Sequence, residues 1–553
     1  METNSNQSSS VPKIVGVITT ILVCCSCTLI AAAGAIMYRA SQQVPTDFAT
    51  LIPPIDGFVT PSPSPELERP STDTISTETV ETLENTLVPD NDPYNLACRL
   101  QNICNVPTIV PAKQYQLGDQ QIFWVSNSDT NEYFQAPATL RYITDHMYFW
   151  IENSVDYDEG DLKRLGDTFE NKMYPTNREF FGSEWIPGVD NDPHIYILYV
   201  GGLSSLNAET YTAGYFYSPD EYNPLVKEYS NGHEMFFLNA DRVDLSSQLA
   251  YSVLAHEFQH MIHFSTDSNE ESWMNEGLSV LAEILNGYPV NYDLYYVAEP
   301  DLGLTDWLSS SGNNLPHYGQ SSLYLAYFLD RFGEEATKEL VKSPENGLTS
   351  IDESLKALNI TDPLTGNPVT ADDVFMDWAA TMWLMDASIG DGRYHYNNYP
   401  DTPTITVSEP VESCPRSLSG SVNQYGIDYF TITCNGDYTI HFNGSTVVGL
   451  LPVDTNSGKY AFWSNKGDSS DMTLTREFDF TNVSAPVNLS FAMWYDLETD
   501  YDYVFLEAST NGETWEILTT PSGTDEDPSG NSYGWGYNGQ TNGWITEEVD
   551  LSQ

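Results

Sequence analysis

Three neighbouring residues have the types and spacing of a metal-dependent hydrolytic site. His256 and His260 are four positions apart, so in a helix they lie one turn apart on one face, where both imidazoles can reach a single ion. Glu257 lies beside them, placed to accept a proton from water rather than to bind the metal. The segment HEFQH therefore predicts one catalytic zinc ion and a general base.

A third protein ligand is required. His263 shares the helix face, but helical rise places it about 10 Å along the axis from His256, which metal–nitrogen bonds of ~2.1 Å cannot bridge. Glu276, on the next predicted helix, is the better candidate, because a polar turn at 265–269 lets that helix fold back. Three rival carboxylates are expected on the exposed loop as solvated charges: Asp267, Glu270 and Glu271.

Glu283 follows Glu276 by seven positions and lies on the same helical face. It is a candidate partner for the free ring nitrogen of a histidine ligand, and an ordinary exposed helix charge is the alternative. The elements that must position these residues follow from periodicity and from the Gly and Pro positions. Helices are expected at 246–263, 272–285 and 321–332, and strands at 194–200 and 234–239.

HEFQH followed by WMNEGLS resembles the gluzincin metallopeptidases, and within them the hyicolysin-type peptidases. The resemblance covers roughly Val189 to Trp383 and implies that the glutamate of the NEG motif, Glu276, is the third zinc ligand. It also implies an α+β, zincin-type domain with a mixed sheet and active-site helices. The spacing from His260 to Glu276 is shorter than in thermolysin, so the thermolysin substrate pockets are not carried over.

Gluzincins also use a downstream tyrosine or histidine to stabilise the oxyanion of the tetrahedral intermediate. Tyr318 is our candidate for that donor, with His317 second, although a purely structural role for Tyr318 is nearly as well supported. The segment 213–216 is a candidate edge strand for an extended peptide.

Beyond about residue 402 the chain changes to short alternating segments with Gly, Asn and Asp turns, which predicts an all-β sandwich, with strands such as 429–433 and 503–507. Residues 457–468, 492–503 and 509–515 resemble the C-terminal β-sandwich of immune inhibitor A metallopeptidases. The last segment lacks a terminating pattern, so we expect this domain to be incomplete. Calcium ligands are hypothesised among its acidic side chains, against plain turn-forming aspartate: Asp468, Asp471, Asp496 and Asp500, with Glu498 and Asp502 nearby.

The cysteines indicate an oxidising compartment. Four of the seven form two local pairs, Cys98 with Cys104 and Cys414 with Cys434, and we prefer this pairing among the three possible ones. Residues 14–37 are uncharged and mostly apolar, so they read as a transmembrane anchor or a signal segment. The formal charge of −58 excludes nucleic acid as a partner and suits a soluble ectodomain.

The expected organisation places a metallopeptidase domain between a tether and β-rich regions. The expected parts are a tail at 1–13, the apolar segment at 14–37, a disordered Pro/Ser/Thr/Glu-rich linker at 38–93, the peptidase domain at 94–400, a small β region at 401–456 and the β-sandwich at 457–553. The expected function is an extracytoplasmic zinc endopeptidase, either membrane-anchored or secreted, that acts on proteins or peptides. The alternatives are a surface adhesin on a zincin scaffold and an aminopeptidase.

Overall fold

The computed structural model describes residues 77–205, 211–307, 313–399, 402–445 and 449–552. The elements below belong to one unit, formed by residues 75–444 and 453–553. The apolar segment 14–37 and the first part of the expected linker lie outside the described residues. The last part of that linker contains a helix, α2 (Thr77–Asn85). No helix in the described ranges has the length and hydropathy needed to cross a bilayer.

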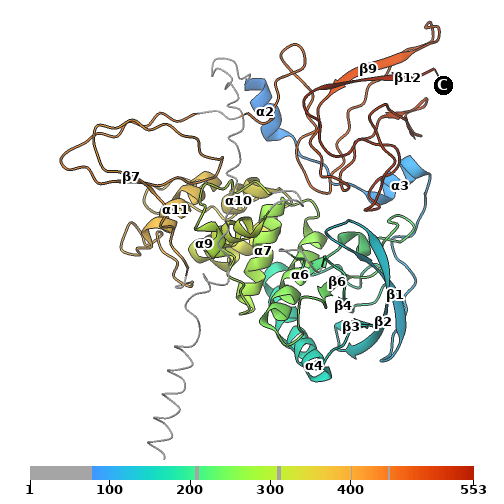
Figure 1. The fold of residues 1–553 in the computed structure, drawn as a ribbon, viewed down its shortest axis with the longest axis horizontal. Helices are drawn as coiled ribbons and strands as arrows, with labels where there is room; N and C mark the ends of the chain where they lie inside the picture. The colour runs from blue at the N-terminus through green and yellow to red at the C-terminus, as the bar shows by residue number, and fades with distance from the viewer. Residues whose placement is uncertain (1–76, 206–210, 308–312, 400–401, 446–448, 553) are drawn as a thin grey trace, which may run out of the picture. The chain divides into compact units, whose positions relative to one another are not determined.

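Six strands form a mixed sheet in the order β1-β2-β3-β4-β6-β5 (Figure 1). Strands β3, β4 and β6 are parallel, whereas β1, β2 and β5 pair antiparallel with their neighbours. The strand bounds are β1 Gln120–Ser126, β2 Tyr133–Ile143, β3 Met147–Glu152, β4 Ile195–Val200, β5 Gly214–Phe216 and β6 Met235–Asn239. The expected strands at 194–200 and 234–239 therefore correspond to β4 and β6.

The central strands are apolar on both faces because each face covers a core. Phe149 of β3 and Ile197 of β4 belong to the larger core, which also contains side chains from the helices. Their chain neighbours Trp150 and Leu198 point the other way, into a smaller core with side chains of β1 and β2. Strand β4 is buried at every position. The run of β-branched and aromatic residues in its sequence is what such a strand requires.

Two long helices follow the sheet and carry the predicted metal ligands. They are α6 (Gln248–Thr266) and α7 (Ser272–Leu285), which begin and end within three residues of the sequence-based bounds. Residues 159–181 supply three shorter consecutive helical segments to the same core: α4 Glu159–Thr168, the π-helical turn η3 Phe169–Met173 and α5 Tyr174–Phe181.

A further helical layer packs on α7. It is formed by α8 (Asp293–Tyr296), α9 (Leu315–Val341), α10 (Gly347–Ala357) and α11 (Ala371–Leu384). Helices α7 and α9 approach closely at Gly277, where a Cβ atom would lie 2.9 Å from Ser321 Cβ and 2.7 Å from a Leu325 methyl carbon. A glycine is therefore needed next to the predicted ligand Glu276. Helix α9 is longer than the expected segment 321–332, and its backbone is non-helical at Gly333.

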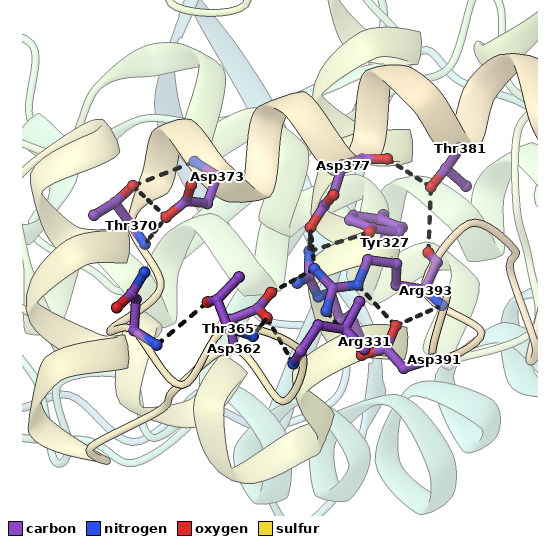
Figure 2. Close-up of polar contacts among 12 residues, drawn as sticks. Tyr327, Arg331, Asp362, Thr365, Thr370, Asp373, Asp377, Thr381, Asp391 and Arg393 are labelled. Atoms are coloured by element: carbon purple, nitrogen blue, oxygen red, sulfur yellow. Dashed lines mark hydrogen bonds and ion pairs between the residues drawn. The ribbon is translucent and has the colours of Figure 1, made fainter. Parts of the chain in front are cut away.

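An ion-pair network fixes α11 and the segment after it against α9 (Figure 2). The Arg393 guanidinium contacts the carboxylates of Asp362 and Asp377 at 2.5 and 3.0 Å. Arg331 of α9 reaches the same Asp377 carboxylate at 2.6 Å. The network anchors α9, whose first turn carries Tyr318, to the rest of the helical layer.

The C-terminal region contains small separate sheets of two strands each. They pair β7 (Glu409–Val411) with β8 (Phe430–Ile432), β9 (Asn488–Met493) with β12 (Ile545–Asp550), and β10 (Glu507–Ala508) with β11 (Glu516–Ile517). The expected strand at 429–433 corresponds to β8. The expected strand at 503–507 is mostly irregular, with a bridge at Val504 before β10. The chain as a whole has an α+β fold.

Candidate metal centre

Helix α6 carries the two predicted histidine ligands and the glutamate beside them; His256 and Glu257 are buried, and His260 is half-buried. Its first turn is capped by Ser247, whose hydroxyl accepts the Ala250 N–H at 3.2 Å. The helix packs against the end of the sheet, where Gly214 of β5 leaves room for Val253. A Cβ atom at Gly214 would lie 2.5 Å from a Val253 methyl carbon, so this glycine sets how closely α6 approaches the edge strand.

The structure brings His256, His260 and Glu276 together. Glu276 Oε2 lies 3.1 Å from His256 Nε2 and 3.4 Å from His260 Nε2. A tetrahedral ion with bonds of ~2.1 Å has ligand atoms separated by ~3.4 Å along each edge. The two nitrogens and one oxygen fit zinc in both spacing and chemistry, and three protein ligands leave a fourth position for water or substrate.

The outer ring nitrogens of both histidines are held by other side chains. His256 Nδ1 lies 2.8 Å from Glu283 Oε1, and the Ser252 hydroxyl donates to Glu283 Oε2 at 2.6 Å. Glu283 is 2% exposed, so the structure places it beside His256 and away from solvent. These contacts orient His256 so that its Nε2 atom faces the ligand group.

Sequence reasoning gave no role to the residues that hold His260. His260 Nδ1 lies 3.0 Å from Asn275 Oδ1 and 3.0 Å from the Ser279 hydroxyl oxygen. Both residues lie within WMNEGLS, on either side of Glu276. The signal was present in the motif, because positions 275 and 279 are one helical turn apart and share a face. Identifying their partner required knowing how α7 packs on α6.

Glu257 points to the edge of the sheet. The Phe216 N–H of β5 donates to Glu257 Oε2 at 2.7 Å. Burial raises the pKa of the Glu257 carboxyl, and the nearby His256 and His260 imidazoles offset part of that rise. A carboxyl group whose pKa is raised in this way is suited to accept a proton and later donate it.

The pKa values of Glu276 and His256 are shifted in opposite directions. Burial raises the pKa of Glu276, but His260 and His256 lower it by more, and the net pKa is well below the usual range. Burial lowers the pKa of His256, whereas hydrogen bonds to Glu276 and Glu283 raise it by more, so the net pKa lies above its usual value. A cation at this position, whether a proton or a metal ion, is therefore electrostatically favoured.

Of the two candidate oxyanion donors, Tyr318 lies at the ligand group. Its ring centroid is 6.2 Å from that of His256, and its ring stacks on Tyr292 at 5.1 Å. Burial and the Glu276 carboxylate raise the pKa of the Tyr318 hydroxyl well above 10, so it stays a hydrogen-bond donor. His317 lies beside the Trp307 ring instead, at a centroid distance of 5.7 Å.

The edge strand expected at 213–216 corresponds to β5, which pairs on one side with β6 and forms the end of the sheet. Its Phe216 ring contacts the Phe264 ring of α6 at 5.8 Å. Phe264 also lines a cavity of about 500 Å³ together with Glu221 and Tyr222. The cavity therefore lies beside both the edge strand and the helix that carries Glu257.

The expectation for the loop carboxylates was wrong about their exposure. Asp267 is 8% exposed and Glu270 5% exposed, so neither is a solvated charge. The carboxylate of Glu271 accepts the Trp273 indole N–H at 2.7 Å. The start of α10 covers this turn: the Gly347 N–H donates to Glu270 Oε1 at 2.7 Å, and the Asn346 amide donates to the Asn269 carbonyl at 2.5 Å. The polar composition of the turn gave no sign of this contact.

The aspartates hypothesised to bind calcium are not gathered into one group. Asp468 accepts the Ser272 hydroxyl at 2.8 Å, and Asp471 forms an ion pair with Arg99 at 3.1 Å. In the described part of the chain, the groups of three or more side chains able to share an ion include neither these two residues nor Asp496 and Asp500.

The four cysteines of the described residues form local pairs. Cys98 is bonded to Cys104, and Cys414 to Cys434. The first bridge closes the end of α3 (Pro93–Gln101), and the second ties the segment before β8 to the segment after it.

Known metalloproteases are similar to this chain. The neutral metalloprotease ShpI of Staphylococcus hyicus is 25% identical over 331 residues, which cover 56% of this chain and 72% of that protein. The pre-pro-metalloprotease PrtV of Vibrio cholerae serotype O1 is 28% identical over 106 residues, 19% of this chain and 11% of that protein. The family described as immune inhibitor A-like, MAM domain, matches residues 442–553.

A continuous match over 56% of 553 residues has to include the centre of the chain, so the similarity to ShpI covers α6 and α7, which carry the predicted metal ligands. The MAM match covers the region of small sheets that contains β9 and β12. Only the similarity to ShpI, among these matches, is shown to cover the helices on which the donor atoms meet. The chain is therefore a metallopeptidase that resembles the hyicolysin and immune inhibitor A types.

Proposed function

We propose that the chain is a zinc-dependent endopeptidase that acts on proteins outside the cytoplasm. The observation that carries the proposal is the set of three ligand atoms, in which Glu276 Oε2 lies 3.1 and 3.4 Å from the two histidine nitrogens. An imidazole–imidazole–carboxylate set with tetrahedral spacing suits zinc better than calcium or magnesium, which prefer oxygen ligands.

The residues around this set have separate tasks in peptide hydrolysis. A zinc ion held by the three ligands would polarise the substrate carbonyl and acidify a water molecule. Glu257 takes the proton of the attacking water and passes it to the leaving amine. The Tyr318 hydroxyl donates a hydrogen bond to the substrate carbonyl oxygen, which becomes negatively charged in the tetrahedral intermediate. Strand β5 pairs with the extended peptide through its free edge.

The decisive variant is Glu257→Gln, which keeps the side-chain shape and removes the base. We expect casein hydrolysis to fall about 10²- to 10⁴-fold, with the zinc content unchanged. Glu353→Gln, at an exposed position of α10 that pairs with Lys356, is the matched control. Hydrolysis by the Glu257→Gln variant at the wild-type rate would rule out the mechanism.

Two simple measurements separate the alternatives. An adhesin on a dead scaffold needs no metal, so purified protein without zinc by mass spectrometry would favour it. An aminopeptidase needs a free amino terminus, so cleavage of an internally quenched peptide with an acetylated amino terminus would favour the endopeptidase. The free edge of β5 supports the endopeptidase, because it can pair with peptide on both sides of the scissile bond.

The two disulfides support a location outside the cytoplasm, because cytosolic thiols are kept reduced. Anchoring through residues 14–37 and removal of that segment as a signal are both compatible with this location. We further propose that residues 94–400 form the catalytic domain and that the following regions, 401–456 and 457–553, are accessory. Amino-terminal sequencing of the mature protein tests whether the apolar segment is retained.

A further inference from the structure

A second group of metal-binding side chains lies at the turn that joins α6 to α7. His263, Asp267 and Glu270 each offer one ligand atom, and these atoms all lie within 4.8 Å of one another. His263 is 1% exposed, and the two carboxyl groups are almost as deeply buried. The proposed catalytic ligands do not include any of the three residues.

One oxygen of this group has no hydrogen-bond partner. Asp267 Oδ2 is buried and unpartnered, whereas Oδ1 accepts the Asn269 N–H at 3.3 Å. Glu270 Oε1 accepts two backbone N–H groups, those of Glu271 at 2.6 Å and Gly347 at 2.7 Å. A buried carboxylate oxygen without a partner costs free energy that a bound cation would offset.

The electrostatics of the metal-free group agree with this geometry. Burial is the main cause that raises the pKa of Asp267 to about 6 and that of Glu270 well above its usual range; neighbouring carboxylates contribute to both increases, and backbone hydrogen bonds oppose them. Burial lowers the pKa of His263 to about 4, so its imidazole is neutral and able to bind a metal. His263 Nδ1 lies 3.3 Å from Asn275 Oδ1, which leaves Nε2 as the ligand nitrogen.

We propose that His263, Asp267 and Glu270 hold a second divalent metal ion of the zinc class. The imidazole selects zinc-class ions over calcium and magnesium, whose ligands are oxygen atoms. The site neighbours the catalytic one but is distinct from it, because the two groups of ligand atoms have no residue in common. This inference goes beyond the proposed function, since the second ion takes no part in hydrolysis.

The second ion would stabilise the geometry of the first site. It would tie the last turn of α6 to the loop that leads into α7 and, through the Glu270 carboxylate, to the first residue of α10. Helices α6 and α7 carry the two histidines and Glu276, respectively. The two sites also share Asn275 Oδ1, which contacts the Nδ1 atoms of both His260 and His263.

Metal counting in four forms of the full chain tests the proposal. The forms are wild type, Glu276→Gln, the double variant Asp267→Asn/Glu270→Gln, and the triple variant that combines all three changes. Each is stripped with a chelator and titrated with zinc in excess magnesium, which occupies the exposed acidic groups. Native mass spectrometry then counts the bound zinc, and thermal denaturation measures the gain in Tm.

We expect two zinc ions in wild type, one in Glu276→Gln, one in the double variant and none in the triple variant. Zinc should raise the Tm of Glu276→Gln but not that of the triple variant. The metal-free double variant controls for folding, because amides replace buried carboxyl groups of the same shape and its Tm should not fall below that of metal-free wild type.

The outcomes separate this proposal from the proposed function. A single zinc ion in wild type that the Glu276→Gln change removes would overturn the second site and leave the catalytic zinc intact. A single zinc ion that the Asp267→Asn/Glu270→Gln changes remove and the Glu276→Gln change does not would instead count against the catalytic zinc. Two ions retained in the double variant would also overturn the second site.

Discussion

The Nδ1 atom of His256 and the Oε1 atom of Glu283 lie 2.8 Å apart, and this contact joins the first proposed ligand histidine of α6 to the far half of α7. Glu283 is 2% exposed and also accepts the Ser252 hydroxyl. Helix α7 therefore carries the proposed ligand Glu276 and, two turns later, the carboxylate that orients His256. Both contributions depend on one packing geometry between α6 and α7.

Replacing Glu283 with Gln should weaken zinc binding about 10- to 100-fold, because the carboxylate that orients His256 and raises its basicity is lost. Competition with a fluorescent zinc chelator measures the change. Glu353→Gln again serves as the control and should bind zinc as wild type does. If Glu283→Gln binds zinc as tightly as wild type does, the contact between Glu283 and His256 has only a packing role.

Replacing Asn275 with Ala should also weaken zinc binding, because His260 Nδ1 loses an acceptor at 3.0 Å. The hydroxyl of Ser279 remains close, so we expect the smaller end of the range, about 10-fold. Asn275→Asp restores an acceptor at the same position and should recover most of the affinity. If the Ala and Asp variants bind zinc equally, Asn275 does not orient His260.

Tyr318→Phe should lower kcat about 10²- to 10³-fold, since one donor to the developing oxyanion is removed. KM and zinc content should change little, because the ring and its stacking on Tyr292 remain. Steady-state hydrolysis of a quenched peptide separates the two constants. Tyr295→Phe, at a 44% exposed position of α8, is the control and should keep the wild-type kcat.

The buried Asp267 should make the metal-free chain less stable at high pH. Its pKa is about 6 in the folded chain against a usual value of 3.8, so the folded chain binds more protons between these values. The loss of unfolding free energy from ionising Asp267 is therefore complete above pH 6 and absent below pH 3.8. Asp267→Asn should raise the unfolding free energy by up to about 3 kcal/mol at pH 8, and by little near pH 4.

Thermal denaturation across this pH range, in the presence of a chelator, measures the difference. Asp244→Asn is a control of opposite sign, because hydrogen bonds from Ser246 lower the pKa of Asp244 and stabilise its ionised form. That variant should lose stability at pH 8 and approach wild type at low pH. A Tm difference for Asp267→Asn that does not vary with pH would contradict the assignment.

The sequence alone determined the features that depend on local periodicity, namely which residues share a helix face and where the main elements begin and end. The spacing of His256, Glu257 and His260 fixes their common helix face, and the bounds of α7 followed from its apolar pattern and Gly287. Strands β4 and β6 were recognisable because both faces of a central strand are buried, which requires an unbroken apolar run. The local cysteine pairs were also readable from their spacing.

Only the tertiary structure decided which groups meet across elements. The partners of His260, the placement of Tyr318 rather than His317 beside His256, and the burial of Asp267 and Glu270 all depend on how α6, α7, α9 and α10 pack. Spacing along the chain defines neighbours within one helix, whereas distances between helices are set by side-chain packing such as the close approach at Gly277.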